Sequence, residues 1–440
     1  MPAGSKPKAI TVAPEVPATA DRSAVADMLF YPLLPAESER SLVAGVRRVQ
    51  TNATNRGTSV GLGVSNRGPN VGLAVEDALR AQIGDAIKSV DRTAVLATGG
   101  LDSAVVAALV KDVTGVPPVL IAIRAGLSSP EEIRLQEILA HNLEAPLVTL
   151  DHLPRFHLDS LFRLNDGSDF PAGGVFSHVW DAAAEAAADR GIEIVFTGDG
   201  GNEVFSPGMA SAFDLFRLGR WGQALAVAGR SRDSENTGML RGLGHAVRNT
   251  TLPRSASEGS HYRRWIGDYA DDEAAAHRRR RHQVRGLRRA GLTYREIDAH
   301  LWLERFELAA ARDSTSRVPF RAPIAEIAAP VVAALATEAP FDSNPVRTGC
   351  QDKHALRLLG RKYLPLAITE ARKIGVADQN STLLAGADLD EVIARIKPGA
   401  DWLGLKLDQD FARPTSLPTT EAYGWGRLLT FSVWALNAIA

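Results

Sequence analysis

Residues 93–103 read TAVLATGGLDS, a short apolar run followed by two glycines, an acidic residue and a hydroxyl. The apolar run at 93–97 has the length and composition of a buried strand, and residues 104–113 have the pattern of a helix. Gly99 and Gly100 therefore fall at a turn between a strand and a helix, where a residue without a Cβ lets the backbone turn tightly and approach a bulky group. This unit predicts the beginning of a parallel sheet.

The chain around this unit alternates strand and helix patterns. In chain order they are a helix at 75–90, the strand at 93–97, the helix at 104–113, a strand at 118–123, a helix at 131–143, a strand at 146–150, a helix at 178–190 and a strand at 192–197. Such alternation predicts an α/β fold, a twisted parallel sheet with helices on both faces and ligands at the carboxyl ends of the strands. Beyond Gly208 the pattern is mostly helical, so we expect a helical C-terminal part.

Three regions are expected along the chain. Residues 1–22 mix Pro, Ala, Lys and Ser without a period and predict a disordered tail. Residues 23–73 form a short N-terminal region that ends in a linker rich in Gly, Asn and Thr. Residues 74–440 hold the alternating pattern and the helical part, which we interpret as one catalytic domain.

Composition excludes several classes of protein. Lys and Arg number 50 and Asp and Glu 51, so the net charge of −1 does not favour a nucleic-acid-binding role. The single cysteine, Cys350, excludes disulfide frameworks and cysteine-rich zinc sites and fits a reducing compartment. No apolar run has the length of a membrane span. We therefore expect a cytoplasmic protein without membrane or nucleic-acid partners.

The chemistry of the glycine loop follows from its residue types. The N–H groups of Gly99 and Gly100, with those of the helix that follows, form a cradle for an anion, and the hydroxyl of Ser103 adds a donor. Asp102 would repel a bare phosphate, so it makes sense only with Mg²⁺ between the two. An ordinary Gly-Gly turn capped by Asp and Ser is the alternative. The sequence has no Gly-Lys dipeptide, and therefore no Walker-type loop.

Six blocks of sequence carry a resemblance to a known family. Thr98–Ser103 resembles the pyrophosphate loop of N-type ATP pyrophosphatases, with Thr98 in place of the usual first Ser. The other blocks resemble the C-terminal domain of asparagine synthetases, in that family's order: 196–205 (FTGDGGNEVF), then 317–320 (RVPF), 352–357 (DKHALR), 363–365 (YLP) and 372–376 (RKIGV). This resemblance implies an adenine nucleotide α-hydrolase-like sheet and a carboxylate that attacks the α-phosphate of ATP, after which an amine displaces AMP.

The resemblance also implies roles for individual residues. Asp102 and Asn202 would hold Mg²⁺, while pyrophosphate would bind Thr98, Gly99, Gly100 and Ser103. The adenosine pocket would be lined by Ile123, Thr197 and Gly198. Lys373 would neutralise charge on the phosphates and on the tetrahedral intermediate, Lys353 is a further catalytic candidate, and Asp199 would orient or deprotonate the amine.

Departures from the family pattern concern the amine half of the reaction. Asn202 stands where the family has a magnesium carboxylate, and Thr315 stands where an acidic residue precedes Arg-Val-Pro-Phe. Glutamine-dependent members begin with a glutaminase domain whose nucleophile is a cysteine at position 2, but Pro2 stands there. Fewer than 90 residues precede the ATP-binding part, so residues 23–73 are interpreted as a truncated remnant and glutamine is not expected to supply nitrogen.

The substrate would then supply its own amine. The resemblance divides between two relatives: residues 373–376 are similar to β-lactam synthetases, and residues 200–205 are similar to lasso-peptide cyclases. The predicted function is an ATP-dependent ligase or cyclase of specialised metabolism that acts on a small-molecule or peptide carboxylate. A peptide substrate implies a precursor peptide and its processing protease as partners. The alternatives are an ammonia- or amine-dependent intermolecular ligase and a non-catalytic scaffold with the same fold.

One charged cluster is not explained by this function. It begins with the basic run at 277–281 and continues with Arg285, Arg288 and Arg289. One interpretation is the solvated face of a helix, and the other is a docking surface for an acidic peptide or a phosphate.

Overall fold

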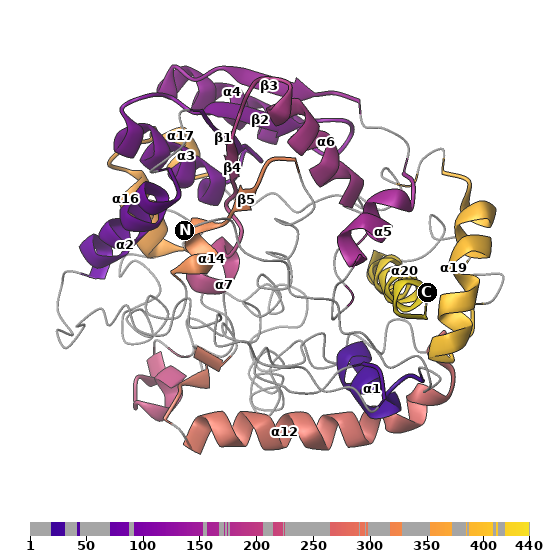
Figure 1. The fold of residues 1–440 in the computed structure, drawn as a ribbon. Helices are drawn as coiled ribbons and strands as arrows, with labels where there is room; N and C mark the ends of the chain where they lie inside the picture. Colours follow the sequence, from indigo (N-terminus) through magenta and orange to yellow (C-terminus); the bar gives the residue numbers. More distant parts are fainter. Residues whose placement is uncertain are drawn as a thin grey trace.

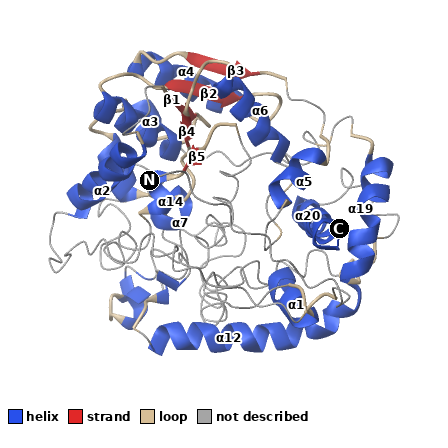
Figure 2. Cartoon of the chain, in the orientation of Figure 1, coloured by secondary structure: helices blue, strands red, loops and turns tan. Residues whose placement is uncertain are grey.

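The computed structural model describes residues 19–30, 42–44, 71–87, 92–152, 156–166, 171, 174, 177–205, 214–222, 224, 265–289, 291–294, 296–297, 317–327, 353–371, 384, 387–407, 411 and 419–439. Its strands are β1 (Thr93–Leu96), β2 (Val119–Ile123), β3 (Leu147–Leu150), β4 (Ile194–Phe196) and β5 (Phe320–Arg321). They form one all-parallel sheet in the order β3-β2-β1-β4-β5 (Figure 2). The predicted α/β class with a parallel sheet is confirmed.

Helices cover both faces of this sheet, as predicted. They are α2 (Val71–Ala86), α3 (Leu101–Thr114), α4 (Pro130–Leu143) and α6 (Ser177–Ala188) (Figure 1). Alternate residues of a strand point to opposite faces. Val95 and Phe196 pack into the core of α2, α3 and α4, whereas Ala94 and Val195 pack against Ala183 of α6 on the other face.

The strand order places a change of direction at the centre of the sheet. The chain runs outward from β1 through α3, β2 and α4 to β3, and then returns to place β4 on the other side of β1. Val95 is in register with Phe196. The loops that follow β1 and β4 therefore leave the same edge side by side, at the switch point where ligands bind in open parallel sheets.

Element boundaries differ from the predictions at α3 and at β4. The helix predicted at 104–113 already begins at Leu101, so Asp102 and Ser103 belong to its first turn. The strand predicted at 192–197 is shorter, at Ile194–Phe196. β5 was not predicted, because two residues are too few to show a period; its pairing with β4 is fixed by Thr197 N–H, which donates to the carbonyl of Arg321 at 2.8 Å.

The remaining helices are α1 (Arg22–Phe30), α5 (Asp159–Asn165), α7 (Gly201–Phe205), η3 (Gly267–Asp272), α12 (Glu273–Arg289), α14 (Pro323–Glu326), α16 (His354–Gly360), α17 (Leu366–Thr369), α19 (Leu389–Leu403) and α20 (Thr419–Ile439). Of these, α7, α14, α16 and α17 add buried residues to the sheet core, whereas α1, α5, η3, α12, α19 and α20 form a second core beside the sheet (Figure 1). In α20, Trp425 is fully buried and its indole N–H donates to the carbonyl of Phe411 at 2.7 Å. None of the helices in the described residues combines the length and the apolar character needed to cross a membrane.

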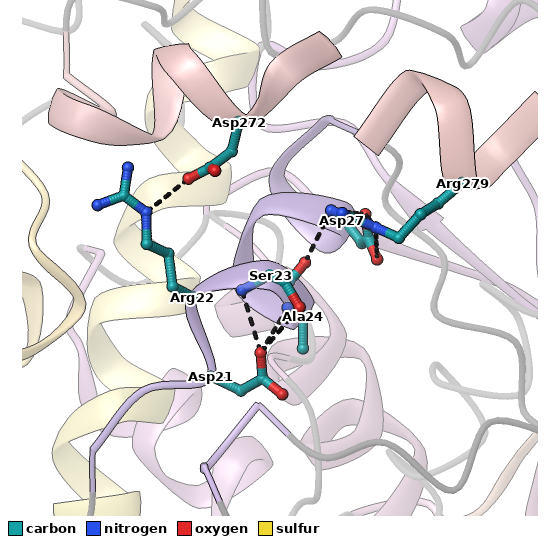
Figure 3. A network of polar contacts seen from close by, with 7 residues as sticks. All are labelled: Asp21, Arg22, Ser23, Ala24, Asp27, Asp272 and Arg279. Carbon is teal, nitrogen blue, oxygen red and sulfur yellow. Dashed lines mark hydrogen bonds and ion pairs between the residues drawn. The ribbon is translucent and has the colours of Figure 1, made fainter. Parts of the chain in front are cut away.

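Residues from the N-terminal region belong to this second core. Ala20 forms an antiparallel bridge with Val43, and Leu29 and Leu42 are fully buried. Asp21 caps α1, because its carboxylate accepts the N–H groups of Ser23 and Ala24, each at 3.0 Å (Figure 3). Residues 1–18 of the predicted tail and the predicted linker before 71 lie outside the described residues, and the three-region division stays a prediction.

Candidate functional site

The glycine loop after β1 is closed by its own hydroxyl groups. Ser103 Oγ donates to the carbonyl of Gly100 at 3.2 Å and accepts the N–H of Thr98 at 3.3 Å. The hydroxyl of Thr98 lies 3.1 Å from Ser103 Oγ and accepts the N–H of Gly100 at 3.3 Å. Threonine at position 98 thus provides the hydroxyl that the resemblance expects from serine, and the loop is preorganised before any ligand binds.

Gly99 is required by both conformation and space. Its φ is 79°, in the left-handed region, and a Cβ there would lie 2.6 Å from the carbonyl oxygen of Glu132. Glu132 sits in the first turn of α4, which Ser129 and Glu132 cap reciprocally. The loop therefore packs directly on the beginning of α4, a contact that sequence reasoning did not foresee.

The start of α3 has the features of an anion site. Gly100 is its N-cap residue, and no side chain among the described residues caps the helix. The first N–H groups of a helix lack intrahelical partners and carry the positive end of the helix dipole, so they favour a phosphate group. This geometry fits the predicted pyrophosphate loop.

The loop after β4 touches the loop after β1 through glycines. A Cβ on Gly198 would lie 2.5 Å from the backbone nitrogen of Ser103, and one on Gly201 would lie 2.2 Å from the carboxyl carbon of Asp102. Gly200, with φ of 90°, leaves no room for a side chain against Ala325 of α14. The glycines of the second block are thus explained by close approach of two backbones, a reason that spacing alone does not reveal.

Asp102 meets Lys353 at this junction. The Lys353 ammonium donates to Asp102 Oδ2 across 251 positions of sequence. Lys353 is 6% exposed and precedes α16, where it adopts the left-handed conformation with φ of 60°. That conformation costs a non-glycine residue about 1–2 kcal/mol. Lys353 was a catalytic candidate, but its pairing with Asp102 was not predicted.

The second carboxylate oxygen of Asp102 is a candidate ligand of Mg²⁺. Oδ1 is buried and has no hydrogen-bond partner among the described residues. A carboxylate oxygen without a donor, beside a phosphate loop, fits Mg²⁺, which takes one or two carboxylates together with phosphate oxygens and water. The described residues contain no group of three or more His, Cys, Asp or Glu side chains that would hold a metal by themselves. Bound Mg²⁺ would take phosphate oxygens and water as its other ligands beside the described carboxylate.

Asp199 and Thr197 form a hydrogen-bonded pair in the loop that follows β4, called here the second loop. Thr197 Oγ1 donates to Asp199 Oδ2 at 2.9 Å, and Thr197 is only 3% exposed. The carboxylate is thereby oriented by a group on its own loop. Asn202 is the second residue of α7 and is exposed. It follows Gly201, whose Cα lies against the Asp102 carboxylate.

Ile123, predicted to line the adenosine pocket, ends β2, next to β1, and its carbonyl accepts the hydroxyl of Ser128 at 3.0 Å.

Lys373, Thr315 and Cys350 lie outside the described residues. The segment leading to Lys373 is nevertheless anchored. Arg357, buried on α16 one turn after Lys353, donates to the carbonyls of Thr369 and Ala371. Arg357 ends the DKHALR segment at 352–357, but its hydrogen bonds to Thr369 and Ala371 were not predicted.

Together, the switch-point location, the closed glycine loop and the acidic residue at its helix start define a nucleotide-binding α/β protein. The sequence profile of the asparagine synthase family matches residues 74–401, about three quarters of the chain, and the chain belongs to that family. It is accordingly an ATP-dependent ligase of the kind that forms amide bonds, in a family that generally uses ATP with Mg²⁺. No curated protein matches the chain significantly.

Proposed function

We propose that this ligase adenylates the carboxylate of a substrate and joins it to an amine of the same molecule, as lasso-peptide cyclases and β-lactam synthetases do. The supporting observation is the contact of the two loops at Asp102. It brings the anion site of α3, a carboxylate oxygen without a donor and the buried ammonium of Lys353 to one place.

The first half-reaction forms the acyl adenylate at this site. A carboxylate oxygen of the substrate attacks the α-phosphorus of ATP, the bond from that phosphorus to the bridging oxygen breaks, and pyrophosphate leaves. The N–H groups of Gly99, Gly100 and the start of α3 would bind the leaving pyrophosphate. Mg²⁺, held by Asp102 and the phosphates, would neutralise part of its charge. Lys353 would bring a further positive charge that stays in place because it is buried.

In the second half-reaction, the amine attacks the carbonyl carbon of the acyl adenylate and AMP leaves with one of the original carboxylate oxygens. The amine must lose a proton, and Asp199, on the loop that follows β4, is the proposed acceptor. Thr197 donates to one of its oxygens and so fixes the direction of the carboxylate. Lys373, from its place in the family pattern, would stabilise the charge of the tetrahedral intermediate.

An amine within the substrate is proposed because residues 200–205 resemble lasso-peptide cyclases and residues 373–376 resemble β-lactam synthetases, both of which cyclise their substrates. A small-molecule or peptide carboxylate substrate, with a precursor peptide and its protease in the latter case, belongs to this proposal.

The chemistry is tested by product analysis. The protein is incubated with ATP, Mg²⁺ and candidate carboxylates that carry their own amine. The carboxylate group of one candidate is labelled with ¹⁸O. We expect AMP and pyrophosphate, one ¹⁸O atom in AMP and a cyclic product. ADP as product would exclude adenylation. Product formation only with added ammonia or a second amine would instead establish an intermolecular ligase.

Asp199→Asn separates the two half-reactions. We expect this variant to retain carboxylate-dependent exchange of pyrophosphate into ATP while amide formation falls by about 10²–10⁴-fold, the usual contribution of a general base. Asp189→Asn, an exposed aspartate after α6, is the matched control and should leave both rates unchanged. Equal loss of both half-reactions in Asp199→Asn would contradict the role given to Asp199.

A further inference from the structure

Helix α12 (Glu273–Arg289) carries seven arginines, and its two ends use them differently. Near its start, Arg279 Nε donates to Asp27 Oδ1 at 2.8 Å, and Arg22 reaches Asp272 at 2.6 Å from the α1 side (Figure 3). These pairs hold α1 against α12. The basic residues at this end therefore have a structural purpose.

The other end of α12 borders a hollow of about 530 Å³. Its lining includes five arginines: Arg217, Arg281, Arg285, Arg288 and Arg289. Three of them, Arg281, Arg285 and Arg289, are four residues apart and share one helix face, where like charges destabilise a helix. Among the described residues, no acidic side chain lies within ion-pair distance of these three or of Arg217. An anion in the hollow would remove this repulsion.

The floor of the hollow is held in place. The guanidinium of Arg288 lies over the ring of Tyr294, 4.4 Å from its centre, and 3.9 Å from the carboxylate of Asp214. Asp214 also accepts the backbone N–H of Tyr294 at 3.1 Å, and Val284 and Ile297 are buried below. Two segments, 214–217 and 291–294, are thus fixed to the end of α12; the first is the short pink helical piece there in Figure 1.

An apolar surface continues from the hollow. Phe216, Leu218 and Trp221 are 41%, 60% and 60% exposed, and the rings of Phe216 and Trp221 lie 4.6 Å apart. Arg217 stands between the first two and also lines the hollow. Exposed aromatic side chains beside arginines are the composition of protein-binding surfaces, where these residue types supply most of the affinity.

We propose that this arginine hollow and the adjoining Phe216–Trp221 surface bind an acidic peptide segment that also carries apolar side chains. From Arg281 to Arg289 the helix rises about 12 Å, the span of about four residues of extended peptide. Carboxylates at alternate positions would reach the guanidinium groups, which match carboxylate geometry. A phosphate-bearing small molecule would satisfy the arginines but would leave the aromatic surface without a function. The inference is independent of the ligase reaction.

The test measures binding of a fluorescent peptide of about ten residues, the length that covers both surfaces, in which Glu alternates with Leu and Phe. It is done without ATP or Mg²⁺, by fluorescence anisotropy. We expect Arg285→Gln combined with Arg289→Gln to weaken binding at least about tenfold and Trp221→Ala about threefold, in line with arginine and tryptophan anchors. Arg285→Gln alone should also weaken binding, whereas Arg278→Gln, which removes one positive charge from the same helix outside the hollow, is the control matched to it and should change Kd less than about twofold.

Thermal melts of each variant check that these exposed substitutions leave the fold intact. Two competitors separate the possible ligands. A peptide with Ser in place of Leu and Phe keeps the charge and should bind more weakly, whereas tripolyphosphate should displace the labelled peptide only at higher concentration than unlabelled peptide does. Absence of peptide binding, equal weakening by Arg278→Gln, or tighter binding of the Ser peptide or of tripolyphosphate would each overturn the proposal.

Discussion

The carboxylate of Asp102 has one oxygen paired with Lys353 and one buried oxygen without a hydrogen-bond partner in the part of the chain that the structure describes. Both features belong to the first turn of α3, where a negative side chain is also favoured by the helix dipole. Asp102 therefore has a structural role in addition to the catalytic one proposed for it. Removing one member of a buried ion pair costs about 3–5 kcal/mol because the other charge stays buried.

We predict that Asp102→Asn lowers the rate of AMP release at least about 10³-fold, as expected for loss of a main electrostatic element, and that it also destabilises the fold. The double variant Asp102→Asn with Lys353→Met removes both charges. It should regain most of the lost stability in urea unfolding without regaining AMP release. Recovery of activity together with stability would show that Asp102 acts on folding alone.

Gly201 gives a second residue-scale prediction. A Cβ at this position would lie 2.2 Å from the Asp102 carboxyl carbon, so Gly201→Ala must displace that carboxylate. A shift of about 1 Å in a reacting group lowers rates about 10²-fold, and we expect that loss in pyrophosphate–ATP exchange. Gly84→Ala, within α2 and with only Val113 at 3.9 Å, is the control and should keep full activity. An equally active Gly201→Ala variant would remove this contact from the site.

At the scale of elements, helix α2 is tied to the segment after α16 by a buried carboxylate. Glu76 accepts hydrogen bonds from Lys362 and Tyr363 and lies 3.5 Å from Arg80. Burial raises the pKa of Glu76, but the hydrogen bonds from Lys362 and Tyr363 outweigh it and lower the pKa below its ordinary value of 4.5. The network holds α16, and with it Lys353, against the sheet.

A pH dependence follows from that pKa. Because the folded state lowers the pKa of Glu76, its contribution to stability is complete above 4.5 and is lost as the pH falls through the folded value. We predict that Glu76→Gln unfolds at lower urea concentration than the wild type at pH 7 and that the difference shrinks below pH 4.5. Urea titrations monitored by circular dichroism over this range measure it. A difference that stays constant with pH would show that Glu76 is not ionised in the fold.

Elements differ in how much of them is visible in the sequence. β1, β2 and β3 were predicted because apolar runs of four or five residues bounded by glycines and prolines are typical of buried strands. β5 has two residues and exists only because it pairs with β4. The start of α3 was placed too late because Leu101–Ser103 was interpreted as loop, although its N–H groups belong to the helix.

The features of the candidate site also differ in how far the sequence predicts them. Glycines and the acidic residue of a local motif can be recognised from spacing, so Gly99 and Asp102 were found. Contacts between distant segments leave no local signal, and the pairing of Lys353 with Asp102 over 251 positions is of this kind. The fit of Gly201 against Asp102 is another, because its reason is the closeness of two backbones that only the assembled sheet brings together.

On the scale of the whole molecule, the described residues form two large cores besides smaller clusters. One lies between the sheet and α2, α3 and α4, and the other joins α1 to α19 and α20. Leu29 belongs to the second and is fully buried, like Leu79 in the first. The N-terminal region, predicted as a truncated remnant, therefore contributes apolar packing to the helical part.

This arrangement predicts that the N-terminal region is needed for folding. Leu29→Ala should lower the free energy of unfolding by about 2–5 kcal/mol, as for other buried leucines, and deletion of residues 1–44 should leave the second core open and the protein prone to aggregation. Deletion of residues 1–18, which stops before the bridge of Ala20 with Val43, is the control and should be neutral. Guanidinium unfolding of the three variants measures the difference. If Leu29→Ala unfolds at the wild-type midpoint, α1 does not belong to the cooperative unit, and its burial against α19 and α20 contributes nothing to stability.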